Sequence, residues 1–162
     1  MSYRAYGVIG ILAFFAAAAV GVFGLARPHV VAMAGVRPGL LPAVLYGLIV
    51  LAATWTILYA YCAKCACRRK HCSHVFVGSL TVLVPRRAPA PYHRGDHAAL
   101  LAALGVVALA PQPWLLAAPR LLALFWGLFA LAAGLIVVRV CPACRNSRCP
   151  MWRWRRPGGA RA

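Results

Sequence analysis

Four long runs without a charged side chain or a histidine constrain this chain more than any other feature. They cover residues 6–26, 40–61, 98–110 and 121–138. About 20 apolar residues, each rising 1.5 Å along a helix, cross a hydrocarbon core of about 30 Å. Hydrophobic residues make up 64% of the 162 residues, which is too many for a soluble domain. The sequence therefore predicts an all-α integral membrane protein with four transmembrane helices.

The third run is short, because Pro111 and Pro113 follow it closely. Its 13 residues would reach only about 20 Å as a helix. It must thin the bilayer, begin earlier at His97, or continue through a kink into residues 114–118. We still expect a span, since run 121–138 needs an antiparallel neighbour and residues 96–120 are the only stretch left to supply one.

The basic residues predict the orientation in the membrane. With a cytoplasmic N-terminus, 15 of the 18 lysines and arginines lie on the cytoplasmic side, against three on the other: Arg27, Arg37 and Arg120. Basic loops resist translocation, so both termini and all cysteines are expected in the cytoplasm of a multi-pass plasma-membrane protein. Alternatively, the first run is a cleaved signal peptide, with Arg4 before it and a cut after Ala26. That cleavage would leave the sides of the other runs unchanged.

Seven cysteines form two clusters, one after the second run and one after the fourth. Each cluster contains a C-x2-C motif, whose two thiolates can hold one metal ion from a tight turn. Zinc takes four sulfur or nitrogen ligands, which the first cluster can supply alone and the second cannot. The second must share a site with the first or leave a position open. The predicted metal ligands are Cys62, Cys65, Cys67, Cys72, His71 and His74 in the first cluster and Cys141, Cys144 and Cys149 in the second.

The metal is predicted to be zinc or an iron–sulfur cluster. The Cys-Pro steps at Cys141 and Cys149 are a feature of ferredoxin-type clusters, although the cysteine spacing differs from theirs. Flanking lysines and arginines, Lys64 among them, favour the thiolate form. Cytoplasmic thiols are normally kept reduced, which disfavours disulfides. Disulfides remain an alternative if the topology is inverted and the cysteines lie on the other side of the membrane. Acylated or unligated juxtamembrane cysteines are the remaining alternative.

The chain looks duplicated, because residues 45–53 match residues 125–133 and residues 67–72 resemble residues 144–149. We therefore expect a first helical hairpin with its cysteine knuckle in 1–74 and a second in 98–150. A basic, proline-rich cytoplasmic linker occupies 75–97, where the apolar stretch 75–84 is too short to cross a bilayer. A basic Trp/Arg tail occupies 151–162 and suits anionic lipid headgroups.

Small residues predict close helix packing. The first run contains Gly7, Gly10, Gly21 and Gly24, and the fourth contains Ala130 and Gly134 at small-xxx-small spacing. Such residues let helix backbones approach closely in lipid. An alanine-rich composition also scatters such pairs by chance, so the pattern has two readings.

No catalytic constellation is recognisable. The only acid, Asp96, is expected in a loop between His93 and His97, and no charged side chain is expected inside a span, so a proton relay has no carrier. The sequence favours a non-enzymatic, membrane-anchored metal-binding protein, with electron transfer as one role. The alternatives are a scaffold or assembly subunit with structural zinc knuckles, and a membrane dithiol redox protein. We expect a cytoplasmic or membrane protein partner besides anionic lipid, and no nucleic acid.

Overall fold

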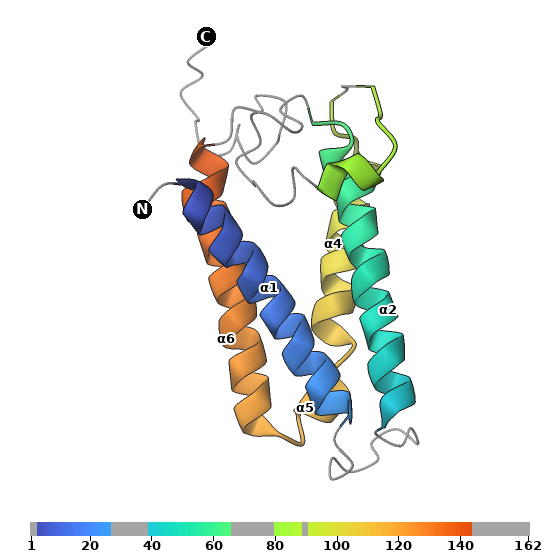
Figure 1. Cartoon of the computed structure of the whole chain (residues 1–162), viewed down its shortest axis with the longest axis vertical. Coiled ribbons are helices and arrows are strands. Elements are labelled where there is room, and N and C mark those ends of the chain that lie inside the picture. Colours follow the sequence, from blue (N-terminus) through green and yellow to red (C-terminus); the bar gives the residue numbers. More distant parts are fainter. Residues whose placement is uncertain (1–2, 27–38, 66–79, 89–90, 144–162) are drawn as a thin grey trace.

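A computed structural model describes residues 3–26, 39–65, 80–88 and 91–143 (Figure 1). Every regular element within these ranges is helical. Four helices are long and apolar enough to cross a membrane, namely Arg4–Ala26, Leu40–Cys62, Arg94–Leu115 and Pro119–Val140. The prediction of an all-helical chain with four candidate spans is therefore confirmed for the described residues.

The spans are built from several shorter elements. The first is α1 (Tyr3–Ala26) and the second is α2 (Leu40–Ile57), continued by the π-helical turn η1 (Leu58–Cys62). The third joins α4 (Arg94–Leu109) to the short α5 (Gln112–Leu115). The fourth is α6 (Pro119–Leu135), continued by the π-helical turn η3 (Ile136–Val140) and the 3₁₀ turn η4 (Cys141–Ala143). The 3₁₀ turn η2 (Thr81–Leu83) precedes α4.

Successive spans run in opposite directions, and α1 is the central one (Figure 1). It lies along both α6 and α2, and α2 also lies along α4. Among the described helices, α4 and α6 make no comparable contact. The antiparallel neighbour of α6 is thus α1, and not the preceding span as the sequence suggested. The expected second hairpin is not confirmed, because α4 packs against α2 whereas α6 packs against α1.

Glycines on α1 explain its central position. A Cβ atom on Gly21 would come within 2.6 Å of the Tyr46 ring of α2, and one on Gly24 within 2.9 Å of Leu115 of α5. On the other side, a Cβ on Gly10 would lie 3.3 Å from Ile136. Close approach through small residues is therefore confirmed for α1. It is wrong for Gly134, where a Cβ would have nothing within 4 Å.

The third span continues through its proline kink because the freed backbone groups find new partners. Pro111 has no N–H to offer the carbonyl of Val107, four residues earlier. The buried hydroxyl of Tyr46 donates to that carbonyl instead, at 2.8 Å. The Gln112 side chain donates to the Ala108 carbonyl at 2.6 Å. Hydrocarbon offers no water to such groups, so these bonds let a broken helix remain inside a bundle.

The same span also begins earlier than its apolar run. Helix α4 starts at Arg94, so Asp96 lies in its first turn, and the expectation of a loop there is wrong. The Asp96 carboxylate accepts a hydrogen bond from the backbone N–H of His93, at 2.9 Å. This is one arm of a capping box, and a carboxylate near a helix N-terminus is also favoured by the helix dipole. The span thus gains length at both ends.

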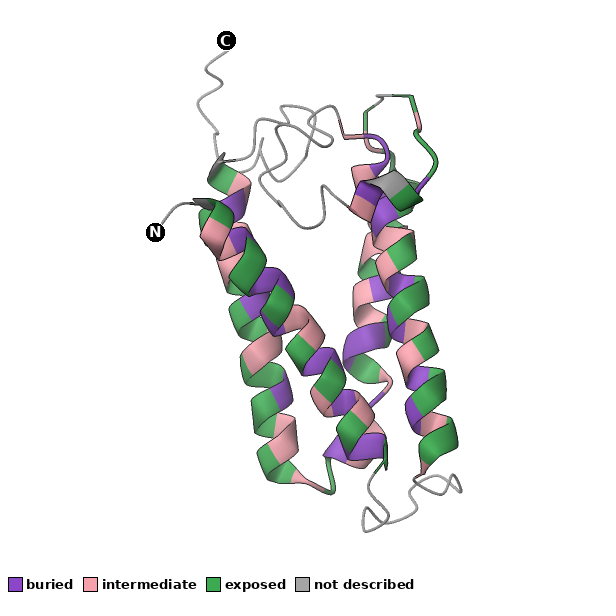
Figure 2. Cartoon of the chain, in the orientation of Figure 1, coloured by how far each residue is buried: buried purple, intermediate pink, exposed green. Residues whose placement is uncertain are grey.

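Burial follows the same arrangement (Figure 2). Buried residues line the faces of α1 and α2 that meet each other and α4, including Ala18, Tyr46, Val50 and Val107. A second cluster joins Ala17 of α1 to Phe125 of α6. Much of α6 is exposed and apolar, as at Leu124 and Leu131. An apolar outer face suits a helix surrounded by lipid rather than water.

Candidate functional site

The first C-x2-C motif lies where the second span ends. Cys62 is the last residue of η1, and Cys65 follows three residues later. The backbone N–H of Cys65 donates to the carbonyl of Cys62 at 3.2 Å, which closes the motif into a turn. Both cysteines are half-buried. This is the tight turn that the spacing predicts, and it keeps two sulfur-bearing residues within one short segment.

The second cluster begins at the same end of the bundle, which we call the cysteine end (Figure 1). Cys141 opens η4, directly after the π-helical turn η3. Cys62 likewise stands at the end of a π-helical turn. π-Helical turns are rare in proteins, and those that occur are often found at functional sites. The two clusters thus share both their end of the bundle and the kind of helix that leads into them.

Only part of the predicted metal site falls within the described residues. These contain three of the nine predicted ligands, Cys62, Cys65 and Cys141. Within the same residues, no group of three or more His, Cys, Asp or Glu side chains is close enough to hold a metal ion. The remaining predicted ligands lie outside the described residues: Cys67, His71, Cys72, His74, Cys144 and Cys149. The tail 151–162 also lies outside them.

An ion pair fixes the first cysteine turn to the third span. Lys64, which lies between Cys62 and Cys65, places its Nζ 2.5 Å from Oδ2 of Asp96. The two side chains are only 5% and 8% exposed. Arg87 approaches the other carboxylate oxygen, its Nη1 lying 3.6 Å from Oδ1. We call Lys64, Asp96 and Arg87 the polar anchor. Two cations face one buried carboxylate, so the acid is fully compensated.

Further contacts hold the same segment. The backbone N–H of Arg87 donates to the Ala63 carbonyl at 3.3 Å. The Arg87 guanidinium also lies over the Tyr59 ring, 4.8 Å from its centroid. Tyr61 stacks on Tyr92 with centroids 4.7 Å apart, and the Tyr92 hydroxyl donates to the Tyr61 carbonyl. The residues around Cys62 are therefore tied to Arg87 and Tyr92 as well as to α4.

The polar anchor corrects one electrostatic expectation and adds a site that the sequence did not predict. Lys64 was expected to favour thiolates nearby, but its ammonium group is paired with Asp96. One sequence signal could have indicated this ion pair, namely that the chain has a single acidic residue. A single carboxylate among 18 lysines and arginines is a ready partner for a basic residue that folding buries. The pairing joins residues 32 apart in the chain, so no local pattern reveals it.

Charge in the described residues gathers at the cysteine end. The start of α1, the end of η1, the start of α4 and the end of η3 lie at that end (Figure 1). These element ends and the residues just beyond η1 and η2 supply its basic residues, Arg4, Lys64, Arg86, Arg87, Arg94 and Arg139. Only Arg120 among the described lysines and arginines lies at the other end. Arg139 also lies over the Tyr6 ring, 5.5 Å from its centroid, and so joins the start of α1 to η3. The asymmetry that predicted the orientation is therefore present between the two ends of the folded bundle.

The chemistry available at the cysteine end is that of paired sulfur ligands on a braced turn beside a basic surface. Two cysteines at C-x2-C spacing supply two ligands of a tetrahedral site, and further ligands must come from elsewhere in the clusters. Compared with known proteins, the chain matches no protein-family model, no curated protein and no solved structure. What can be inferred about function therefore comes from this end of the bundle itself.

Proposed function

We propose that this chain is a multi-pass membrane protein whose two cysteine clusters together bind a metal ion at the cytoplasmic end of its helical bundle. One observation carries the proposal: Cys62 and Cys141, the first cysteines of the two clusters, lie at the same end of the bundle. Cys62 is the last residue of one π-helical turn, and Cys141 directly follows the other. The rest of each cluster follows directly in the chain. The first cluster covers eleven residues, 62–72, and the second covers nine, 141–149. The remaining ligands of each cluster therefore follow within a short stretch of chain that begins at the cysteine end.

A shared site follows from the ligand count. The second cluster has three cysteines and no histidine, one ligand short of a closed zinc site. The first cluster has four cysteines and two histidines, and so has ligands to spare. A site fed by both clusters would connect the ends of α2 and α6, which are not packed together as neighbouring helices. Metal binding would then close the cysteine end of the bundle.

The polar anchor supports this function by positioning the first ligands. Lys64 lies inside the C-x2-C motif and is held by Asp96 of α4, so the turn is fixed against the bundle before any metal arrives. Ordering ligands in advance removes an entropic cost of binding. The uncompensated cations nearby, such as the exposed Arg86 and Arg94, offset the negative charge of a thiolate site.

Zinc and an iron–sulfur cluster imply different roles. A colourless zinc site would shape a docking surface for a cytoplasmic or membrane partner. An iron–sulfur cluster would relay electrons to such a partner. A metal-free C-x2-C pair would act as a dithiol in redox exchange. The braced turn favours metal binding over dithiol exchange, because a fixed ligand geometry serves coordination directly.

The proposal is tested on protein purified anaerobically in detergent with reductant present. Thiols are counted by alkylation and mass spectrometry before and after a strong chelator is added, and the absorption spectrum is recorded. We expect most of the seven cysteines to be protected until the chelator removes the metal. Visible absorption that bleaches on reduction identifies iron–sulfur, and its absence with protected thiols identifies zinc. Full alkylation without chelator, in a protein that still melts cooperatively, contradicts metal binding.

A further inference from the structure

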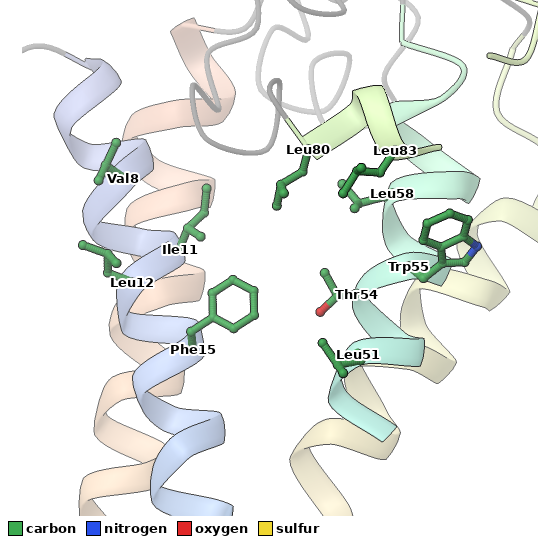
Figure 3. A pocket seen from close by; sticks show the side chains of 10 residues that line it. All are labelled: Val8, Ile11, Leu12, Phe15, Leu51, Thr54, Trp55, Leu58, Leu80 and Leu83. Atoms are coloured by element: carbon green, nitrogen blue, oxygen red, sulfur yellow. The ribbon is translucent and has the colours of Figure 1, made fainter. Parts of the chain in front are cut away.

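An apolar cavity of about 480 Å³ lies between α1 and α2 (Figure 3). The α1 wall includes Val8 and Phe15. The opposite wall includes Leu51 and Thr54 of α2 and Leu58 of η1. Thr54 is the one hydroxyl among the lining side chains, and it donates to its own helix at the Val50 carbonyl, 2.8 Å away. Trp55 adds an indole N–H, and the other lining side chains are aliphatic or aromatic hydrocarbon, so the cavity offers mainly hydrophobic contact. Its volume is that of ordinary small-molecule sites, about 300–1,000 Å³.

The lining residues of α1 and α2 come from the halves of these helices nearer the cysteine end, where the two helices diverge (Figure 1). Leu80 and Leu83, from the segment containing η2, line it on that side (Figure 3). Three of its lining residues are largely exposed, Leu12 at 62%, Leu51 at 63% and Leu83 at 65%. The cavity is thus open to the surroundings between two candidate membrane spans. In a bilayer that these spans cross, the surroundings at that position would be acyl chains.

Positive charge flanks the cavity on the side where lipid headgroups would lie. Arg4 precedes Val8 by four residues on α1, and so lies on the same helix face one turn nearer the helix start. Arg86 follows Leu83 by three residues beyond η2. Both arginines are exposed, and the described salt bridges involve neither of them. An apolar slot below two arginines complements a ligand with a hydrocarbon chain and an anionic head.

We propose that this cavity binds one acyl chain of an anionic phospholipid, whose headgroup is attracted by Arg4 on the α1 side and by Arg86 on the side of η2. The lipid would fill the space between α1 and α2 where these helices separate, and so link the two sides of the bundle. The proposal requires the helices to span a membrane, but it does not depend on metal binding. Failure of either proposal leaves the other standing.

Trp55 lines the cavity and provides a local reporter. In a variant whose other four tryptophans are phenylalanine, Trp55 is the sole indole emitter. The delipidated protein is reconstituted into phosphatidylcholine vesicles containing a minor fraction of phospholipid with brominated acyl chains. Brominated phosphatidylglycerol is compared with brominated phosphatidylcholine at the same fraction. We expect stronger quenching of Trp55 by the anionic lipid, with saturation at low fraction.

Thr54 and Thr56 provide a matched pair of substitutions. Each threonine donates to a backbone carbonyl four residues earlier, Val50 for Thr54 and Ala52 for Thr56. Only Thr54 lines the cavity. We expect Thr54→Phe to weaken binding of the brominated anionic lipid by about tenfold or more, because the new ring and an acyl chain would compete for one space. Thr56→Phe should leave the binding curve unchanged.

The charges are tested separately. Arg4→Gln and Arg86→Gln should each reduce the preference for the anionic lipid, whereas Arg120→Gln at the other end should not. Equal quenching by both lipids, or unchanged binding in Thr54→Phe, overturns the proposal. So does a hydroxylamine-sensitive acyl group on the intact protein that blocks quenching, since the chain would then fill its own cavity. If the single-tryptophan variant does not fold, lipid retained by the otherwise unmodified chain and by the two threonine variants is counted by mass spectrometry with the same criteria.

Discussion

The ammonium group of Lys64 lies 2.5 Å from the carboxylate of Asp96, and both side chains are buried at the cysteine end of the bundle. Lys64 belongs to the first C-x2-C turn and Asp96 to the first turn of α4. We expect Asp96→Asn to lower the free energy of unfolding by about 3–5 kcal/mol, because it leaves a buried cation without its counter-charge. Thermal melting in detergent, followed by circular dichroism, measures this loss.

A double variant separates the ion pair from packing. Replacing both partners, as in Lys64→Met with Asp96→Leu, removes the unpaired charge and should recover most of the lost stability. Arg120→Gln is the control for removing an exposed charge and should change stability by less than about 0.5 kcal/mol. An Asp96→Asn protein as stable as the parent would show that the pair does not hold the turn.

The hydroxyl of Tyr46 should be worth more than an ordinary hydrogen bond, because it satisfies the Val107 carbonyl that Pro111 leaves without its usual N–H donor. We expect Tyr46→Phe to destabilise the bundle by about 1–2 kcal/mol. Pro111→Ala restores an N–H four residues after Val107. The penalty of Tyr46→Phe should therefore shrink in the Pro111→Ala background. An equal penalty in both backgrounds would contradict this explanation of the kink.

Glycine substitutions test the central position of α1. Gly21→Ala places a methyl group 2.6 Å from the Tyr46 ring, which its own hydrogen bond holds in place. We expect a loss of about 1–3 kcal/mol from this overpacking. Gly134→Ala on α6 has nothing within 4 Å and should be neutral or stabilising by up to about 1 kcal/mol. Two equal effects in melting experiments would argue against the packing described here.

Thiol labelling tests the orientation. A cysteine-free chain carrying Arg120→Cys presents one thiol at the end opposite the polar anchor. We expect an impermeant maleimide to label it in intact cells, since the proposed orientation puts the basic end in the cytoplasm. The native chain should be labelled only after the cells are permeabilised, and only after a chelator is added. Labelling of the native cysteines from outside would reverse the topology and with it the cytoplasmic site.

The four candidate spans could be predicted because a membrane helix requires a long run of uncharged, apolar residues, and such a run is visible in the sequence. The start of α4 at Arg94 was missed, because the search for apolar runs assigned Asp96 to a loop, whereas its carboxylate accepts from the N–H of His93 within the helix start. The continuation past Pro111 was one of three options, and choosing it depends on the tyrosine hydroxyl of another helix. The start at Arg94 and the continuation past Pro111 both depend on hydrogen bonds of particular side chains, which the length of an apolar run does not predict.

Helix neighbours and the polar anchor were not predictable for a related reason. Connectivity suggested that consecutive spans pair, but close approach at Gly10 joins α1 to the last span instead. Lys64 was predicted to favour the thiolate form of the cysteines beside it in the chain, whereas its partner is Asp96 of another helix. The metal site remains a prediction, since Cys67, Cys72 and four other expected ligands lie outside the described residues.

The central claim, that both cysteine clusters share one metal site, is tested most directly by counting metal per chain in purified protein. Mass spectrometry of inorganic elements is applied to the native chain, to Cys62→Ser with Cys65→Ser, and to Cys141→Ser with Cys144→Ser and Cys149→Ser. A shared site predicts stoichiometric zinc or iron in the native chain and a large loss of metal in both variants. A native chain without metal, or a second-cluster variant that retains all of it, would contradict the account.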